Sequence, residues 1–303
     1  MTYYQNVLSS TDYGPYQQGF RYAANLVCTS TIANSGVNLG IIQPIEGYNC
    51  TDINWGTSAG VPVTVSFWFK SNQTGFTSFG FRNQDIFNIT YTSPAFNYPV
   101  AGVWQYYSTT VPPPPTGYTW QNNTNLGSIG LYLGGNQGAQ TGSSSSVGGW
   151  STGTAAFGYN NQINYLITGN YIAFTGVQLE KGSVATTWEQ RPYATELALC
   201  QRYYEVSNGL NYMALVSAFG ATYGSTTYYK VSKRANPTVS LYDNTGTGGS
   251  GASGRFTGTV SGGGGSVNGL TPSAENVGPN SFTFNGTSGY ALASFGWNSS
   301  AEL

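Results

Sequence analysis

The chain has 303 residues, of which 7% are charged and 15% are aromatic, with 42 glycines, no histidine and a net charge of −1. This length gives room for two domains, and the scarcity of helix-forming residues favours an all-β chain with many turns. The charge balance and the lack of a basic cluster argue against nucleic-acid binding, and no hydrophobic run reaches membrane-spanning length.

The first part of the sequence predicts a series of short strands. Residues 61–70, VPVTVSFWFK, give the clearest pattern, because Val63, Val65 and Phe67 alternate with a second set that includes Thr64 and Ser66. Such alternation places the first set, with Val61 and Phe69, in a core between two sheets. Further strands are expected at residues 18–28, 39–45, 75–88, 104–111 and 126–133, a stiff proline loop at 112–115, and a long exposed Gly/Ser-rich loop at 137–154.

Residues 170–207 are the most charged part of the chain and separate two regions of different composition. The run from Tyr171 to Leu179 predicts a strand with apolar residues on both faces, which is typical of a central strand. Residues 195–206 predict a short helix with Thr195 as its N-cap. One side of this helix would carry Leu197, Cys200 and Tyr204, at spacings of three and four residues.

The last region predicts a second, smaller β structure with strands at 210–219, 226–232, 238–242, 254–260, 281–285 and 290–297. The resulting organisation is a sandwich at 1–190, a connecting helix at 191–207 and a small distal β domain at 208–303. Lys230, Lys233 and Arg234 form a small positive cluster, which we interpret as a solvated edge that blocks aggregation between sheets.

Two motifs carry a family resemblance. Residues 176–206, GVQLEKGSVATTWEQRPYATELALCQRYYEV, and residues 45–71, IEGYNCTDINWGTSAGVPVTVSFWFKS, together with the final SSAEL, resemble segments of bacteriophage structural proteins, mostly tail-fibre or minor tail proteins. The resemblance implies a jelly-roll β-sandwich like that of a carbohydrate-binding module, followed by a small distal domain. It also allows a structural Ca²⁺ near Glu46 or Glu180, but calcium prefers several carboxylates and acids are scarce, so no cofactor is predicted.

The absence of histidine removes the usual serine triad and the commonest general base. A glycosidase would need two carboxylates, and Glu46 and Asp52 are the candidates because both lie in the second motif. The alternative, which we favour, is that they accept backbone hydrogen bonds in tight turns, so the protein is not predicted to be an enzyme. Cys28, Cys50 and Cys200 are widely spaced and are expected to be buried small hydrophobes.

Glycan binding would require exposed aromatic rings that stack on sugars, with amides and hydroxyls as hydrogen-bonding neighbours. The candidates are Tyr118, Trp120 and Trp150, because they lie in predicted loops. The alternative for each is packing under a loop or at a subunit interface.

A long chargeless span separates Asp85 from Glu180. A solvated surface usually mixes charges of both signs, so we expect partner subunits to cover part of this span in a homo-oligomer. The resemblance to phage appendage proteins implies that this oligomer is a trimer. The N-terminal MTYYQNVLSS lacks the features of a signal peptide, which predicts synthesis in the cytoplasm of the bacterial host.

Three functions fit this sequence. The first is a virion surface protein of the tail-fibre or appendage type that contacts other virion proteins and attaches to host surface polysaccharide without catalysis. The second is a purely structural virion component, such as a capsid decoration protein or head fibre. The third is a depolymerase. The chain has no coiled-coil or repeat sequence for a long shaft, so a short appendage is expected.

Overall fold

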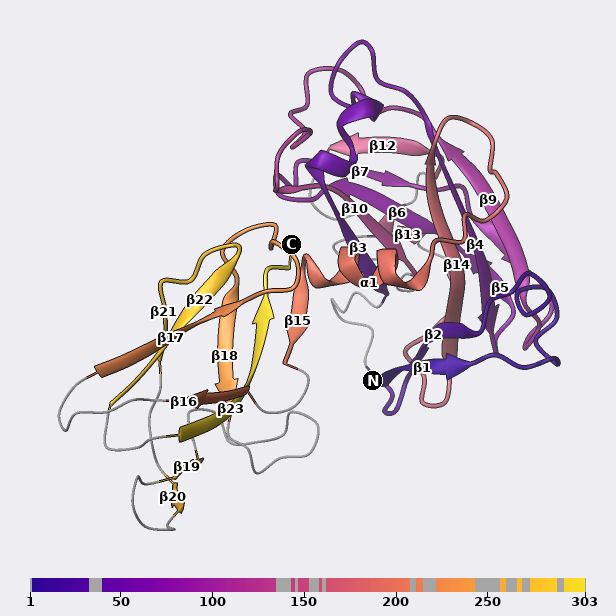
Figure 1. Cartoon of the computed structure of the whole chain (residues 1–303). Helices are drawn as coiled ribbons and strands as arrows, with labels where there is room; N and C mark the ends of the chain where they lie inside the picture. The colour runs from indigo at the N-terminus through magenta and orange to yellow at the C-terminus, as the bar shows by residue number, and fades with distance from the viewer. Residues whose placement is uncertain are drawn as a thin grey trace. The chain divides into compact units, whose positions relative to one another are not determined.

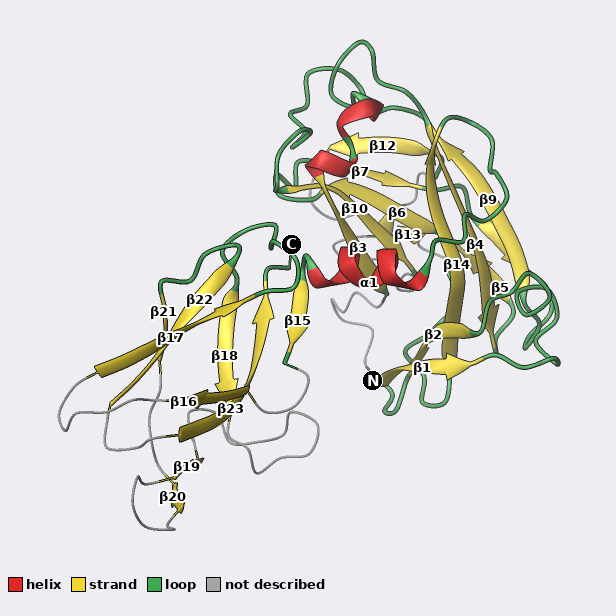
Figure 2. Cartoon of the chain, in the orientation of Figure 1, coloured by secondary structure: helices red, strands yellow, loops and turns green. Residues whose placement is uncertain are grey.

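Strands dominate the computed structural model (Figure 2), which confirms the predicted all-β fold class. It describes residues 2–32, 40–134, 143–144, 147–152, 158–159, 162–207, 211–214, 222–242, 257–259, 266–268, 273–287 and 292–302. These residues include one α-helix, and none of their helices is long and apolar enough to cross a membrane. The chain divides into two units, Met1–Glu189 and Gln190–Glu302.

The first unit is a β-sandwich of two antiparallel five-stranded sheets (Figure 1). Successive strands switch between the sheets at most connections, which is the jelly-roll arrangement. The first sheet has the order β1 (Thr2–Val7), β2 (Tyr22–Val27), β14 (Tyr171–Lys181), β4 (Val63–Ser71) and β9 (Gln105–Val111). The second has the order β12 (Gly149–Thr152), β7 (Ile89–Thr92), β6 (Phe79–Asn83), β10 (Gly127–Leu133) and β3 (Ile41–Glu46). Shorter elements are β5 (Gly75–Thr77) with β8 (Phe96–Tyr98), β11 (Ser143–Ser144) with β13 (Gly158–Tyr159), and the 3₁₀ helices Gly47–Asn49 and Thr51–Ile53.

The core between the sheets is built mainly from aromatic and β-branched side chains. The inward set predicted for β4 is confirmed, since Val63, Val65, Phe67 and Phe69 are each at most 1% exposed. Phe67 packs edge-on against Phe79 of the opposite sheet, with ring centroids 6.0 Å apart. The alternation along one strand therefore fixes which face of the first sheet meets the second.

The single strand predicted at residues 75–88 is wrong, because this segment forms two short strands, β5 and β6, and then a turn. The side chain of Asn83 accepts a hydrogen bond from the backbone N–H of Asn88 at 3.0 Å and so ends β6. Phe87 lies in this turn in the left-handed region, at φ 56°, and its ring lies over the guanidinium of Arg82. Phe76 is also exposed, so only Phe79 and Phe81 of this segment enter the core.

Strand β14 is central, as predicted, and pairs with β2 on one side and β4 on the other. Its two faces do not keep one alternation along the whole strand. The register with β4 shifts between Thr175 and Gln178, and Gly176 between them has a φ of 59°. This β-bulge exchanges the faces, so Ile172 and Phe174 enter the core before it, and Val177 and Leu179 pack against the same core after it.

Replacing Gly176 with alanine should destabilise the first unit by about 1–3 kcal/mol. The backbone at this position is unfavourable for a residue with a Cβ, and an added Cβ would lie 2.6 Å from the ring of Phe20. Gly169→Ala is the matched control, because Gly169 also has a positive φ but has open space around its Cβ position. Urea unfolding of both variants measures the difference, and an equal loss in the two would show that the contact with Phe20 has no role.

In the second unit the C-terminal strand β23 (Leu292–Ser300) is the centre of the largest sheet, where it pairs with β15 (Tyr204–Val206), β16 (Asn211–Ala214), β18 (Thr238–Tyr242) and β19 (Thr257–Thr259). Strand β19 also pairs with β20 (Ser266–Asn268). A second sheet has the order β17 (Thr222–Tyr228), β22 (Ser281–Thr287) and β21 (Ser273–Glu275). The aromatic core of the second unit is formed by Tyr229, Phe282 and Trp297, whose ring centroids are 5.4 to 5.8 Å apart.

The helix α1 (Tyr193–Gln201) begins earlier and ends earlier than predicted. Its N-cap is Pro192, without a side-chain hydrogen bond, so Thr195 is not the cap. Residues 204–206, expected to be helical, form β15 because they pair with β23 instead. Strand pairing with the distant chain end thus overrides the local helical pattern.

The cysteines are only partly as predicted. Cys28 and Cys50 are buried, and burial raises the pKa of the Cys50 thiol to about 12. Cys200 lies on α1 and is exposed, so the expectation that all three are buried is wrong for this residue.

The expected solvated positive edge in the second unit holds only for Lys230, which is exposed, and is wrong for Lys233. Lys233 is 2% exposed and its ammonium lies 2.7 Å from the carboxylate of Glu205, which is 3% exposed. Lys233 also donates to the carbonyl of Gln201, at the end of α1. Arg234 donates to the backbone carbonyls of Ala301 and Glu302, so it holds the chain end. The sequence predicted these charges at the surface because it does not show that Glu205 is a buried ion-pair partner of Lys233.

Candidate functional site

The three aromatic residues predicted to bind glycans lie at one part of the sandwich, but not on an exposed loop. Trp120 is only 7% exposed and belongs to the core, so its ring face is not free and the alternative of packing under a loop is confirmed for this residue. Trp150 belongs to the edge strand β12, within the segment predicted as an exposed loop, and is half-buried. Tyr118 is half-buried and packs against the sandwich core. The remainder of the predicted loop lies largely outside the described residues.

Trp120 and Trp150 pack against Trp55, which is 1% exposed. The ring centroids of these tryptophans are 5.0 Å apart for Trp55–Trp120, 5.4 Å for Trp55–Trp150 and 5.8 Å for Trp120–Trp150, and all three pairs are edge-to-face. The indole N–H of Trp150 donates to the carbonyl of Pro112 at 2.9 Å. This tryptophan cluster (Trp55, Trp120 and Trp150) therefore closes the core, and its rings do not offer open platforms.

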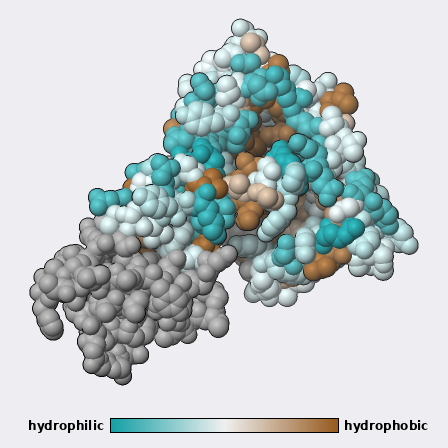
Figure 3. Space-filling view, viewed as in Figure 1, coloured by the Kyte–Doolittle hydropathy of each residue, from teal (hydrophilic) through white to brown (hydrophobic). Residues whose placement is uncertain are grey.

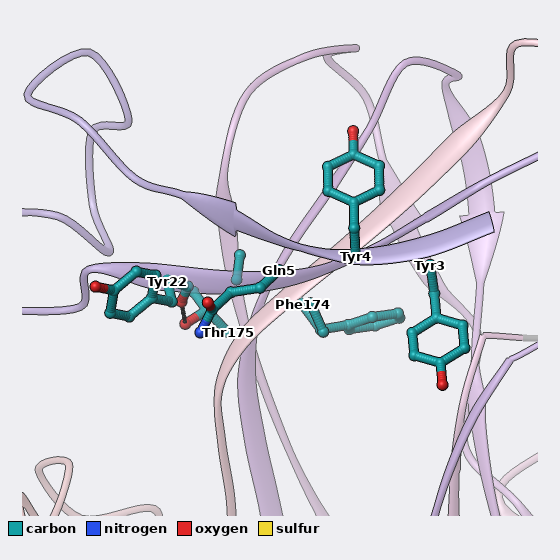
Figure 4. Close-up of a pocket in the computed structure, with 8 residues that line it drawn as sticks. Tyr3, Tyr4, Gln5, Tyr22, Phe174 and Thr175 are labelled. Atoms are coloured by element: carbon teal, nitrogen blue, oxygen red, sulfur yellow. Dashed lines mark hydrogen bonds between the residues drawn. The ribbon is translucent and has the colours of Figure 1, made fainter. Parts of the chain in front are cut away.

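A more accessible aromatic surface lies at the opposite edge of the first sheet, on the β1–β2 hairpin. It is an open groove of about 310 Å³ (Figure 4). Its walls come from β1, β2 and β14, and the residues that line it are Tyr3, Tyr4, Gln5, Tyr22, Ala23, Ala24, Phe174 and Thr175. We call this set the tyrosine groove. A second cavity, between Phe67 and Tyr107, is much smaller, at about 70 Å³.

Strand alternation arranges the tyrosine groove. Tyr3 and Gln5 of β1 point to the same side of the hairpin as the ring of Phe174, whereas Tyr4 points to the opposite side (Figure 4). Phe174 is 3% exposed and forms the floor, while Tyr3 is 83% exposed and Tyr22 is 54% exposed. The edge of the first sheet thus presents aromatic rings where the sandwich core ends.

The register of the hairpin sets the length of the groove. Tyr22 lies opposite Val7 of β1. Tyr3, four residues before Val7 on β1, lies opposite Leu26. At about 3.3 Å per residue the backbone positions of Tyr3 and Tyr22 are therefore about 13 Å apart along the strand. Two platforms at this separation suit an extended ligand better than a single small ring.

The chemistry of the groove is neutral. None of its lining residues is Asp, Glu, Lys or Arg. The amide of Gln5 and the phenol hydroxyls of Tyr3 and Tyr22 offer both hydrogen-bond donors and acceptors. The hydroxyl of Thr175 donates to the carbonyl of Tyr22 at 2.8 Å and so fixes β2 against β14. Aromatic rings beside neutral polar groups can bind an uncharged polyhydroxyl chain.

Sequence reasoning missed this groove, although a signal was present. Residues 2–7, TYYQNV, combine adjacent tyrosines with no charge and no glycine. The other half of the groove comes from β2, the next strand, and from β14, which follows much later in the chain. Only the pairing of these strands brings Tyr22 and Phe174 to Tyr3.

The two carboxylates considered for catalysis, Glu46 and Asp52, lie in surroundings that differ from each other. Glu46 is 1% exposed at the end of β3, whereas Asp52 is exposed and forms an ion pair with Lys181 at 3.3 Å. Glu180, the other residue considered for Ca²⁺, accepts hydrogen bonds from the backbone and hydroxyl of Thr186. Across the described ranges there is no group of three or more acidic, cysteine or histidine side chains that could hold a metal ion. The residues present therefore do not fit a calcium site of several carboxylates.

Comparisons with known proteins add little. No protein-family model matches the chain, and no curated protein matches it. Among solved structures, recombinant discoidin II of Dictyostelium discoideum aligns with 98% of this chain and 94% of its own, at 10% identity and a TM-score of 0.19. Similarity at this level supports no argument, so the assignment of the fold rests on the strands themselves.

Proposed function

We propose that this protein is a non-catalytic attachment protein of a bacteriophage virion, which binds host surface glycans through the tyrosine groove. The groove is the main support for the proposed glycan binding, because it combines exposed Tyr3 and Tyr22 with neutral polar groups. The phage assignment is supported by the resemblance of residues 45–71 and 176–206 to tail-fibre and minor tail proteins. The groove takes the role that the sequence had suggested for Tyr118, Trp120 and Trp150.

Aromatic stacking on a sugar is weak for each ring, so we propose that several copies act together. A homo-oligomer, most simply a trimer on the virion surface, would present one groove per copy and gain avidity without new contacts. The chargeless span between Asp85 and Glu180 supports this proposal, because its surface would not repel a neighbouring copy. Other virion proteins would hold the oligomer in place.

Binding without catalysis is supported by the residues that the chain lacks. It has no histidine, and the groove contains no carboxylate that could act as acid, base or nucleophile. Recognition through neutral groups predicts that the affinity for glycan depends little on ionic strength. Binding should change little between low and physiological salt, because no charged side chain lines the groove.

Tyr3→Ala and Tyr22→Ala should each weaken binding to isolated host surface polysaccharide by about 3- to 10-fold, since each removes one stacking ring. Tyr13→Ala is the matched control, because Tyr13 is 75% exposed but lies outside the groove. Titration of immobilised polysaccharide with each purified variant measures the change. All three substitutions replace exposed side chains, so their thermal unfolding should match that of the unchanged protein.

Two results would contradict the proposal. Unchanged binding by both groove variants, or no binding by the unchanged protein, would favour a purely structural component such as a capsid decoration protein or head fibre. Release of reducing sugar that is abolished by Glu46→Gln or Asp52→Asn would show a depolymerase and overturn the non-catalytic assignment.

A further inference from the structure

The tyrosine groove presents its aromatic and polar side chains on one face of the β1–β2 hairpin. Side chains alternate along β1, so Tyr3, Gln5 and Val7 share this face. Tyr22 lies directly opposite Val7, and opposed residues of antiparallel strands point to the same side of the sheet. One ligand that lies along the hairpin can therefore contact Tyr3, Gln5 and Tyr22 together.

The middle of the groove is lower than its two ends. Gln5 lies opposite Ala24, and Ala24 lies opposite Phe174, which forms the floor. The methyl group of Ala24 leaves space above this floor, whereas the rings of Tyr3 and Tyr22 remain exposed at the two ends. A bound chain would rest on both rings and face the amide of Gln5 between them.

The distance between the two ends sets a minimum length for the ligand. The backbone positions of Tyr3 and Tyr22 are about 13 Å apart, at about 3.3 Å for each strand residue. A pyranose ring is similar in size to a phenol ring, so one sugar unit cannot stack on both tyrosines. A chain of roughly three or more sugar units spans this distance, with one unit on each ring and one beside Gln5.

The cation that is nearest to the groove in sequence is held on the other face of the sheet. Arg21 directly precedes Tyr22, but its guanidinium lies over the ring of Tyr16, 4.3 Å from the centroid, and donates to the carbonyls of Tyr16 and Phe20. Tyr16 packs against a small core that contains Ala23. The side chain of Ala23 points away from the groove, because it alternates with Tyr22 along β2.

The other charged residue of the hairpin is also neutralised on that far face. Asp12 is 9% exposed, lies 3.0 Å from the ammonium of Lys70, and accepts a hydrogen bond from the indole N–H of Trp104 at 2.8 Å. Trp104 belongs to the same small core as Ala23. A carboxylate on a ligand in the groove would therefore gain no cation in return for the hydration that it loses.

The hydropathy of the surface agrees with a hydrated ligand. In the coloured, described part of the first unit, the face seen in Figure 3 is largely teal and white, with brown atoms in smaller areas. A large apolar patch would indicate a protein partner. Exposed tyrosines within a mixed surface offer apolar rings and polar hydroxyls together, which suits a polysaccharide.

We propose that the tyrosine groove binds a stretch of roughly three or more units of an uncharged polysaccharide, aligned with β1. Tyr3 and Tyr22 stack on two sugar units that are not adjacent, and the amide of Gln5 hydrogen-bonds the unit between them. This inference rests on the proposed function and adds to it the class of glycan and the way in which the glycan lies.

Fragments of the host surface polysaccharide, made by partial acid hydrolysis and separated by length, test the two rings. The affinity of the unchanged protein, measured by calorimetric titration, should rise about 3- to 10-fold at the length that reaches both tyrosines. Longer fragments also offer more binding registers, but Tyr22→Ala shares that gain, so the step missing in this variant isolates the second ring. Tyr13→Ala should keep the step. The same length dependence in Tyr22→Ala and the unchanged protein would overturn the inference.

Gln5→Ala should weaken the binding of fragments that span the groove by about 3- to 10-fold, because it removes the central hydrogen bonds. Asn6→Ala is the matched control, since Asn6 is the next residue of β1, also carries an amide and points to the opposite face. Calorimetric titration with the same fragments measures both variants. Equal losses in the two would contradict the role of Gln5.

Anion exchange separates the same hydrolysate into uncharged and acidic fragments, which tests the class of glycan. Uncharged fragments should displace the protein from the immobilised polysaccharide, and acidic fragments of equal length should not. Displacement by acidic fragments, or binding to a polysaccharide that yields only acidic fragments, would overturn the inference. Failure of these tests in a protein that binds the whole polysaccharide would leave the proposed function standing, whereas no binding to the polysaccharide would overturn both.

Discussion

Replacing Trp55 with alanine should lower the free energy of unfolding of the first unit by about 3–5 kcal/mol, the range for a large side chain removed from a core. Trp55 is 1% exposed and packs edge-to-face against Trp120, Trp150 and Phe81. Its indole N–H donates to the carbonyl of Val61 at 2.8 Å, directly before strand β4. The substitution would therefore open a cavity and also leave the half-buried carbonyl of Val61 without this donor.

Trp188→Ala is the matched control for Trp55→Ala. Trp188 is 38% exposed and has one edge-on contact, with Phe20 at 5.0 Å, so its removal should cost about 1 kcal/mol or less. Urea titration followed by circular dichroism measures both losses. Similar losses for the two tryptophans would contradict the role of the tryptophan cluster in closing the sandwich core.

Replacing Lys233 with methionine should destabilise the second unit by about 3–5 kcal/mol, because it leaves the carboxylate of Glu205 buried without its cation. Lys233 is the ion-pair partner of Glu205 and also lies over the ring of Tyr229, 4.8 Å from its centroid. Burial, together with the nearby Glu205 carboxylate, raises the pKa of Tyr229 to about 12. The low polarity that shifts Tyr229 is the reason why an unpaired charge is so unfavourable here.

A double substitution separates the unpaired charge from simple loss of packing. Glu205→Gln combined with Lys233→Met removes both charges, so it should recover part of the stability lost in Lys233→Met alone. Lys230→Met is the control for the loss of a positive charge, since Lys230 is exposed and its removal should change stability by about 0.5 kcal/mol or less. Thermal unfolding measures all three variants. Equal losses for Lys230→Met and Lys233→Met, or no recovery in the double variant, would count against a buried ion pair.

The elements best predicted from sequence are those whose inward and outward faces follow from the order of their own residues. Strand β4 is the example, because its alternation alone identifies Val63, Val65 and Phe67 as inward-facing. The sidedness of β14 was not predictable in the same way. A bulge at Gly176 reverses the alternation, and its position depends on the pairing with β4 and on the ring of Phe20.

The errors in the candidate site have a common physical cause. Trp150 follows a Gly/Ser-rich stretch typical of an exposed loop, but pairing with β7 makes its segment a strand, and Trp55 and Trp120 cover its ring. Lys233 likewise appears solvated until its partner Glu205 is known. Local composition predicts exposure only when no distant segment returns to cover the residue. The tyrosine groove is the opposite case, since Tyr3 and Tyr22 stay exposed and the distant Phe174 of β14 forms only the floor between them.

The central position of β23 has a consequence for biosynthesis. The sandwich has all of its paired strands once β14 has left the ribosome, so the first unit can fold while the rest of the chain is still being translated. The second unit cannot, because β15, β16, β18 and β19 all pair with a strand that is translated after them. Until Leu292–Ser300 emerges, the backbone N–H and C=O groups along the edges of these strands stay unpaired, and a polypeptide cut short by premature termination never pairs them. Chaperones and proteases would meet such incomplete products in an unfolded form, so only chains translated as far as β23 would survive to be assembled.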